Sequence, residues 1–172
     1  METVHRAILV GNANYPADPH NLPTLNGPAH DLKLLAETLT DATHGLFRKE
    51  HVQTLFDNDR QEVEAALESF LLSASPDDHL LLYYSGHGVL DRADRLYFCA
   101  RDSRIDRLVT TAISESQVKG MLDQSPARSF IILLDCCNSG TFTSKGVGGR
   151  SRWPPWSDRS SPCPPARSTS PT

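Results

Sequence analysis

Residues 80–88 read LLLYYSGHG, and residues 130–140 read FIILLDCCNSG. Each stretch opens with five apolar or aromatic residues, which is the length and composition of a strand buried on both faces. Each then passes directly into small and reactive residues. Buried strands of this kind form parallel sheets, and ligands in such sheets bind beyond the carboxyl ends of the strands. The two stretches therefore predict an α/β fold with a functional site where these strands end.

The rest of residues 1–142 alternates strands with helices. Strands are expected at 6–11 and 51–56, a small hairpin strand at 96–100, helices at 27–39 and 60–72, and a third helix from a capping box at 114–117. The apolar positions expected to face the core are Ala29, Leu32, Leu35, Ala36 and Leu39 in the first helix, Val63, Ala66, Leu67 and Phe70 in the second, and Val118, Met121 and Leu122 in the third. This alternation predicts a mostly parallel sheet with helices on both faces.

Residues 143–172 differ sharply in composition. Sixteen of these 30 residues are Pro, Ser or Gly, and five basic residues stand against one acidic residue. No apolar period continues past Phe142, so the segment buries too little apolar surface to offset the entropy of ordering it. We expect one core domain over 1–142, followed by a disordered Pro/Ser/Arg-rich tail over 143–172.

The whole-chain composition excludes several classes of function. With 17 Lys+Arg against 21 Asp+Glu, the net charge of −4 gives no support for a nucleic-acid or membrane-surface partner. No apolar run approaches the roughly 18 residues of a membrane span, and no signal peptide is visible. The adjacent cysteines Cys136 and Cys137 are awkward for a disulfide framework, which favours a reduced, cytoplasmic setting.

The two strand ends carry a possible catalytic pair. A single Cys after a buried strand is usually a small core residue, and a single His usually satisfies a local hydrogen bond. Here His87 and the two cysteines follow strands that can be neighbours about 4.8 Å apart. A thiolate is a nucleophile, and a nearby imidazole can take its proton. A Gly-flanked turn such as that at Gly88 also offers backbone N–H groups to an oxyanion. The combination favours nucleophilic catalysis.

These same stretches resemble the paired signature of caspase-like peptidases, particularly metacaspases and bacterial caspase-like domains. The resemblance rests on Tyr84-Ser85-Gly86-His87-Gly88 and Leu134-Asp135-Cys136-Cys137-Asn138-Ser139-Gly140, and it extends over about residues 5–142. It implies a three-layer caspase-hemoglobinase-like sandwich and cysteine endopeptidase activity on a protein or peptide substrate, with no organic cofactor. Domains of this family continue after the cysteine loop into two further strands and a helix. No such pattern follows Phe142, so we expect the C-terminal strands to be missing.

The resemblance also implies site residues. His87 matches the catalytic His, and Cys137, three residues before Gly140, matches the nucleophile. Asp31, Ser85 and Asp135 match the pocket for the P1 side chain in metacaspases. Two carboxylates in such a pocket favour Arg or Lys through charge-assisted hydrogen bonds, although Asp31 also has an ordinary interpretation as an acidic residue in the first turn of a helix.

No metal is expected at this site. Calcium activates many metacaspases, and Asp91, Asp94 and Asp102 are acidic residues in the relevant part of the chain. The adjacent acidic pair typical of the calcium-dependent group is replaced here by Thr110-Thr111, which argues against calcium dependence. No set of His and Cys has the spacing of zinc ligands either.

Two other functions fit the order of the motifs. One is a catalytically incompetent interaction module that binds a partner through an unpaired sheet edge. The other is a His–Cys peptidase of the separase or CHAT type, with a different specificity. The context of Asp135, Cys136 and Cys137 favours the caspase-like branch. The sequence does not decide whether the chain forms a dimer or is fused to a partner domain.

Overall fold

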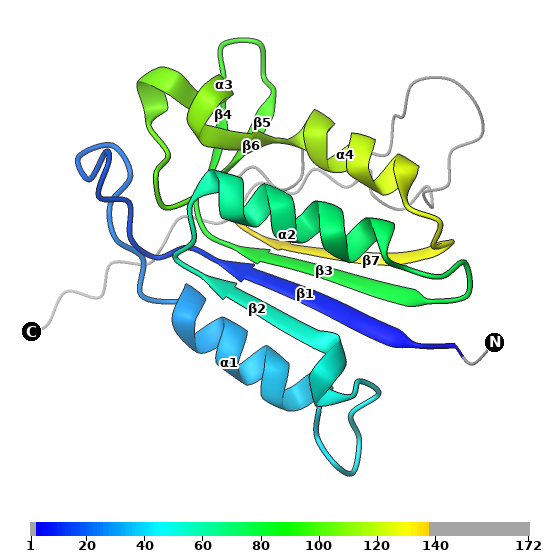
Figure 1. The fold of residues 1–172 in the computed structure, drawn as a ribbon. Helices are drawn as coiled ribbons and strands as arrows, with labels where there is room; N and C mark the ends of the chain where they lie inside the picture. The colour runs from blue at the N-terminus through cyan, green and yellow to red at the C-terminus, as the bar shows by residue number, and fades with distance from the viewer. Residues whose placement is uncertain (1–2, 138–172) are drawn as a thin grey trace, which may run out of the picture.

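The fold is built on a four-stranded parallel sheet. The computed structural model describes residues 3–137 of the chain, so the expected boundary at 142, the tail and the C-terminal strands lie outside the described residues. The strand order is β2-β1-β3-β7, made from β1 (His5–Gly11), β2 (Val52–Phe56), β3 (His79–Ser85) and β7 (Ser129–Asp135) (Figure 1). All three pairings are parallel, as the sequence predicts.

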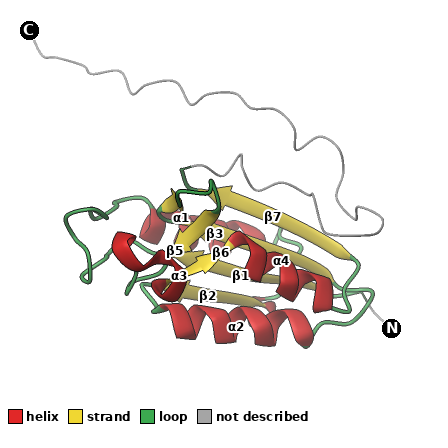
Figure 2. Cartoon of the chain, turned by 90° about the horizontal axis from the view of Figure 1, so that it is seen from above, coloured by secondary structure: helices red, strands yellow, loops and turns green. Residues whose placement is uncertain are grey.

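Helices cover the two faces of this sheet. The helix α1 (Pro28–Leu39) packs on one face, and α2 (Arg60–Leu72) and α4 (Glu115–Gln124) pack on the other (Figure 1). Figure 2 shows α2 and α4 side by side along the sheet. Capping boxes start both helices, with Asp59 and Glu62 in α2 and Ser114 and Gln117 in α4. The three-layer arrangement is confirmed.

The apolar stripe of α1 differs from the prediction at one position. Leu32 is buried and Leu35 and Leu39 pack against the same cluster, but Ala29 is exposed. Pro28 takes the buried place in the first turn instead. Residues 28, 32, 35 and 39 follow the spacing of one helix face, whereas residue 29 lies about 100° away from residue 28.

A second, smaller sheet lies beside the first. It contains β4 (Gly88–Leu90), β5 (Leu96–Cys99) and β6 (Ala112–Ser114) in antiparallel order β4-β5-β6. The predicted hairpin is the β4–β5 pair. The remaining short elements are the 3₁₀ turns η1 (Lys49–His51) and η2 (Ile105–Arg107) and the single helical turn α3 (Leu108–Thr111).

The expectation that every central strand is covered on both faces is wrong for β7. Its Ile131 and Leu133 are 56% and 42% exposed. They lie on the α1 side of the sheet, where α1 covers Ala7 and Leu9 of β1 and residues of β3 but does not extend over β7. An apolar run shows that a strand suits a buried position, but it does not say which element supplies the cover.

Within residues 3–137, none of the helices has the length and apolar character that crossing a membrane would require.

Candidate active site

The site lies where β3 and β7 end. These strands are direct neighbours, and Ser85 pairs in register with Asp135. The Gly86 N–H then donates to the Asp135 carbonyl across 3.3 Å. Two residues further on, the backbone of Gly88 lies against the Cys136–Cys137 turn, so closely that a Cβ on Gly88 would stand 2.3 Å from the carbonyl oxygen of Cys137. The structure thus brings together the two motifs that the sequence singles out.

His87 is held by contacts to both its backbone and its ring. Its N–H donates to the Tyr15 hydroxyl at 3.0 Å, and its carbonyl accepts from the Tyr84 hydroxyl at 2.9 Å. Its ring Nε2 lies 2.8 Å from the carbonyl oxygen of Pro23. Because a carbonyl oxygen can only accept, this contact requires a proton on Nε2, and in the neutral imidazole Nδ1 then keeps its lone pair.

No sequence pattern marks Tyr15 or Pro23 as part of the site. Both belong to the loop between β1 and α1, more than 60 residues before His87. This loop is rich in Asn and Pro, which marks it as irregular but gives no indication of what it contacts. Only the parallel pairing of β1 with β3 places it beside the His87 turn.

The adjacent cysteines lie in different surroundings. Cys136 is half-buried, packs against the main apolar core and has its Sγ 3.0 Å from the position of a Cβ on Gly88. Burial raises the pKa of its thiol to about 12, with the neighbouring Cys137 and Asp135 adding to the effect. Burial also raises the pKa of Cys99 to about 12. Cys137 is exposed. Among the cysteines in residues 3–137, it alone is classed as exposed.

The three residues predicted to form the P1 pocket come together on the α1 side of the sheet. Ser85 is buried, with 3% of the residue exposed, and its hydroxyl donates to the Asp31 carboxylate at 3.3 Å. Asp135 lies opposite Ser85 at the end of β7 and is exposed. Tyr83 is a fourth member that the sequence analysis did not identify. Burial raises the pKa of its hydroxyl, and the charges of Asp135 and Asp31 raise it further.

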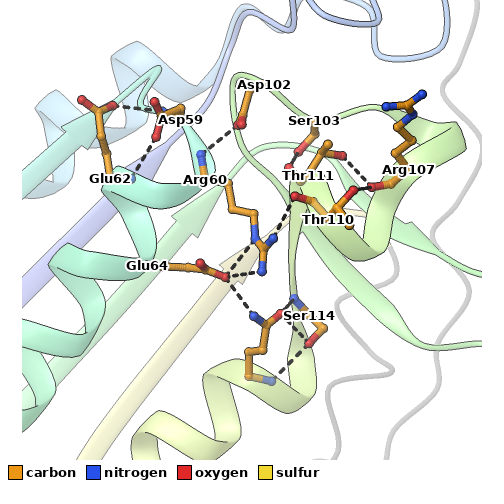
Figure 3. A network of polar contacts seen from close by, with 11 residues as sticks. Asp59, Arg60, Glu62, Glu64, Asp102, Ser103, Arg107, Thr110, Thr111 and Ser114 are labelled. Atoms are coloured by element: carbon orange, nitrogen blue, oxygen red, sulfur yellow. Dashed lines mark hydrogen bonds and ion pairs between the residues drawn. The ribbon is translucent and has the colours of Figure 1, made fainter.

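Two of the three acidic residues considered for calcium, Asp91 and Asp102, have other partners. The Asp91 carboxylate lies 2.6 Å from the Arg95 guanidinium, which holds the pKa of Asp91 down at about 2. Asp102 accepts from the backbone N–H of Arg60 at 2.8 Å (Figure 3). No group of three or more side chains suited to a metal is found within residues 3–137.

Thr110 belongs to the same polar network. The Arg60 guanidinium donates to the Thr110 carbonyl at 2.8 Å and lies 2.8 Å from Glu64, which also accepts from Gln117 (Figure 3). Arg60 therefore ties the start of α2 to the turn before β6. Thr110, which stands where calcium-dependent relatives have an acidic pair, thus takes part in a contact that joins two elements of the fold.

The comparisons with known proteins agree with this fold. The caspase domain family matches residues 4–165, and the chain belongs to that family of peptidases. The match continues past residue 142 and so includes most of the segment that composition sets apart.

One similar solved structure is protein GSU0716 from Geobacter sulfurreducens, with 21% sequence identity and a TM-score of 0.58. The similarity covers 78% of this chain and 50% of that one, so this chain spans about half the length of that protein. It supports the same fold. No curated protein matches the sequence.

Proposed function

We propose that this protein is a cysteine endopeptidase that cleaves peptide bonds after Arg or Lys, using Cys137 as nucleophile and His87 as general base and acid. The observation that carries the proposal is the packing of the His87–Gly88 turn against the Cys136–Cys137 turn at the ends of adjacent strands. Cys137 is the better nucleophile because it is exposed, whereas burial keeps Cys136 as a thiol.

The hydrogen bond to Pro23 prepares His87 for this role. In the neutral imidazole, with Nε2–H donated to the Pro23 carbonyl, Nδ1 carries a lone pair that can accept the proton of the Cys137 thiol. The thiolate attacks the carbonyl carbon of the substrate, and the negative charge passes to the carbonyl oxygen. We assign the backbone N–H of Gly88, a residue whose Cα side faces the Cys137 carbonyl, as a donor to this oxyanion.

The remaining steps return the site to its starting state. Collapse of the tetrahedral intermediate breaks the C–N bond, and the proton on His87 goes to the leaving amine. A water molecule then gives its proton to His87 and attacks the thioester. The carboxylic acid product leaves, and the Cys137 sulfur recovers its proton.

The acidic cluster supports the choice of Arg or Lys at P1. Asp135 stands two residues before the nucleophile, and Ser85 links it to Asp31 on α1. A guanidinium bonded to a carboxylate gains roughly 1.5–3 kcal/mol, which corresponds to about a ten- to hundredfold selectivity. An Asp side chain at P1 would bring like charges together beside these carboxylates.

Matched fluorogenic peptides that differ only at P1 test the proposal. The full chain should hydrolyse the Arg and Lys peptides and leave the Asp and Leu peptides almost uncut, with and without calcium. Cys137→Ala and His87→Ala should abolish turnover, while Cys136→Ala should retain it. Preferred cleavage of the Asp peptide, or activity that survives Cys137→Ala, would overturn the assignment.

The edge of β7 supports a second candidate function, the association of two copies of this chain. Among the described residues β7 pairs on one side only, and none of residues 129–135 is a Lys, Pro or Gly that would protect an edge strand. Antiparallel pairing about Ile132 would place the exposed Ile131 of one copy opposite Leu133 of the other, on one face.

Sedimentation velocity tests this association. The full chain should dimerise with rising concentration, and Ile131→Lys should prevent it. Val109→Lys changes a residue that is 65% exposed elsewhere on the surface, and this control variant should still dimerise. A chain that stays monomeric at every concentration would exclude this function.

A further inference from the structure

Tyr15 makes two contacts with His87, although it lies 72 residues away in the sequence. Its side chain is buried, with 2% of the residue exposed. Its hydroxyl accepts from the His87 backbone N–H at 3.0 Å and donates to the Asn12 carbonyl at 2.8 Å. Its ring lies against the His87 imidazole, with the centroids 4.9 Å apart and the planes tilted by 49°.

We propose that Tyr15 is a positioning residue for catalysis, which fixes the orientation of the His87 ring so that Nε2 faces Pro23 and Nδ1 stays available to the thiol. This inference rests on the proposed function of His87. Tyr15 touches the imidazole but neither the nucleophile nor the P1 pocket, so it acts through His87 and is not itself a catalytic residue.

The hydroxyl and the ring of Tyr15 restrain different parts of His87. The hydroxyl fixes the backbone, and the Tyr84 hydroxyl and the Cys99 N–H fix the same peptide segment at the His87 carbonyl, at 2.9 and 3.0 Å. The aromatic ring limits rotation of the imidazole on one face. The Pro23 carbonyl meets the ring nitrogen. A change at Tyr15 therefore alters the orientation of the imidazole before it alters the fold.

The loop that carries Tyr15 is itself firmly anchored. The Asp57 carboxylate accepts from the backbone N–H groups of Ala13 and Asn14 at 2.7 and 3.0 Å. Asp57 has a φ of 52°, a left-handed backbone conformation that non-glycine residues adopt rarely. Asp18 accepts from the Ile105 N–H at 2.9 Å and ties the loop to the 3₁₀ turn η2. Tyr15 is thus presented by a loop with fixed ends, as a positioning role requires.

The chemistry of the Tyr15 hydroxyl fits a structural donor and acceptor. Burial raises its pKa well above the ordinary value for a tyrosine, so the hydroxyl keeps its proton at neutral pH. The hydroxyl donates its proton to the Asn12 carbonyl, and one of its lone pairs accepts from the His87 N–H. Phenylalanine would retain the ring contact but leave a backbone N–H without its acceptor.

Two variants and one control separate positioning from general stability. Tyr15→Phe removes the hydroxyl alone, and Tyr15→Leu removes the ring as well. Tyr97→Phe is the control, because Tyr97 is 4% exposed and belongs to the same buried cluster as Tyr15. The first readout is kcat and KM on an Arg peptide. The second is the ¹⁵N spectrum of the His87 ring, assigned by its absence in His87→Gln, which reports the tautomer without any need for turnover.

In the wild-type chain the ¹⁵N spectrum should show a single tautomer with the proton on Nε2. Tyr15→Phe should lower kcat by about 10- to 100-fold while KM stays within about threefold, and the ring should then populate both tautomers. Tyr15→Leu should lower kcat further. Tyr97→Phe should match the wild-type chain in both readouts.

The possible failures can be told apart. If His87→Gln leaves turnover unchanged, or the wild-type chain does not cleave the peptide, the proposed function fails, and the tautomer alone then decides the role of Tyr15. If His87→Gln abolishes turnover but Tyr15→Phe keeps the wild-type kcat and the Nε2 tautomer, the positioning role is wrong and the proposed function stands.

Discussion

A single methyl group at Gly88 should disable the site while leaving the fold intact. In Gly88→Ala the new Cβ would lie 2.3 Å from the carbonyl oxygen of Cys137, whereas real Cβ atoms essentially never approach closer than 3.0 Å. The second obstacle is the Cys136 side chain, with Sγ at 3.0 Å and Cβ at 3.3 Å. Relief requires the Cys137 peptide to move by about 1 Å, because its neighbour Cys136 is held in the core.

A shift of that size falls on the proposed nucleophile. Displacement of reacting groups by about 1 Å can lower a rate by about 100-fold, so kcat/KM on an Arg peptide should fall by about that factor. The free energy of unfolding should fall by only about 1–3 kcal/mol, the usual range for overpacking, because Cys137 is exposed at the end of its strand.

Gly120→Ala is the matched control. Gly120 lies inside α4, and a Cβ there would meet nothing within 4 Å. This variant should gain roughly 0.5–1 kcal/mol of stability from the better helix former and keep its activity. Peptide hydrolysis and urea unfolding of both variants check the prediction. A Gly88→Ala variant with kcat/KM within about threefold of wild type would refute the reasoning.

The remaining predictions concern the thiols, the P1 pocket and the polar network. Iodoacetamide at pH 7 should modify Cys137 and spare Cys136, because a thiol with a pKa of about 12 is ionised to only about 1 part in 10⁵ at that pH. Modification of Cys136 should become appreciable only as the pH rises toward 12. Early labelling of Cys136 in a peptide map would argue against its burial. Asp135→Ala should reduce the preference for an Arg over a Leu peptide by about tenfold or more in kcat/KM, and an unchanged ratio would remove Asp135 from the pocket. Glu64→Gln should lower the free energy of unfolding in urea by about 1–2 kcal/mol, since it weakens the ion pair with Arg60, in which the two side chains are 22% and 25% exposed. The control Glu37→Gln weakens an ion pair with Lys33 whose side chains are 73% and 63% exposed, and it should change this free energy by less than about 0.5 kcal/mol. Equal effects of the two variants would contradict a special role for the network.

The central sheet was predictable because its signals are local. The runs at 80–84 and 130–134 have the composition of buried parallel strands, and the capping box at 114–117 marks where one helix begins. The rule that sites lie beyond the carboxyl ends of parallel strands then placed His87 beside the cysteine turn, and the order β3–β7 confirms their adjacency.

The surroundings of His87 were not predictable because they depend on contacts between distant segments. Tyr15 and Pro23 lie in a loop whose composition shows only that it is irregular. Their approach to His87 depends on the register of β1 against β3, which no pattern in the loop encodes. The exposed face of β7 was not predictable for the same reason. Its apolar residues indicate that the strand suits a buried position, but they do not say which element packs against it. Tyr83 was read as a core residue of a strand, and only the structure places its hydroxyl among Ser85 and the two carboxylates.

Covalent labelling tests the central claim most directly. The full chain is treated with an acyloxymethyl ketone that carries Arg at P1, digested and analysed by mass spectrometry, alongside His87→Ala and a matched probe with Asp at P1. We predict one adduct, on Cys137, which forms with the Arg probe, is lost in His87→Ala and does not form with the Asp probe. An adduct on Cys136, or labelling of Cys137 that is equally fast without His87, would contradict the His87–Cys137 pair.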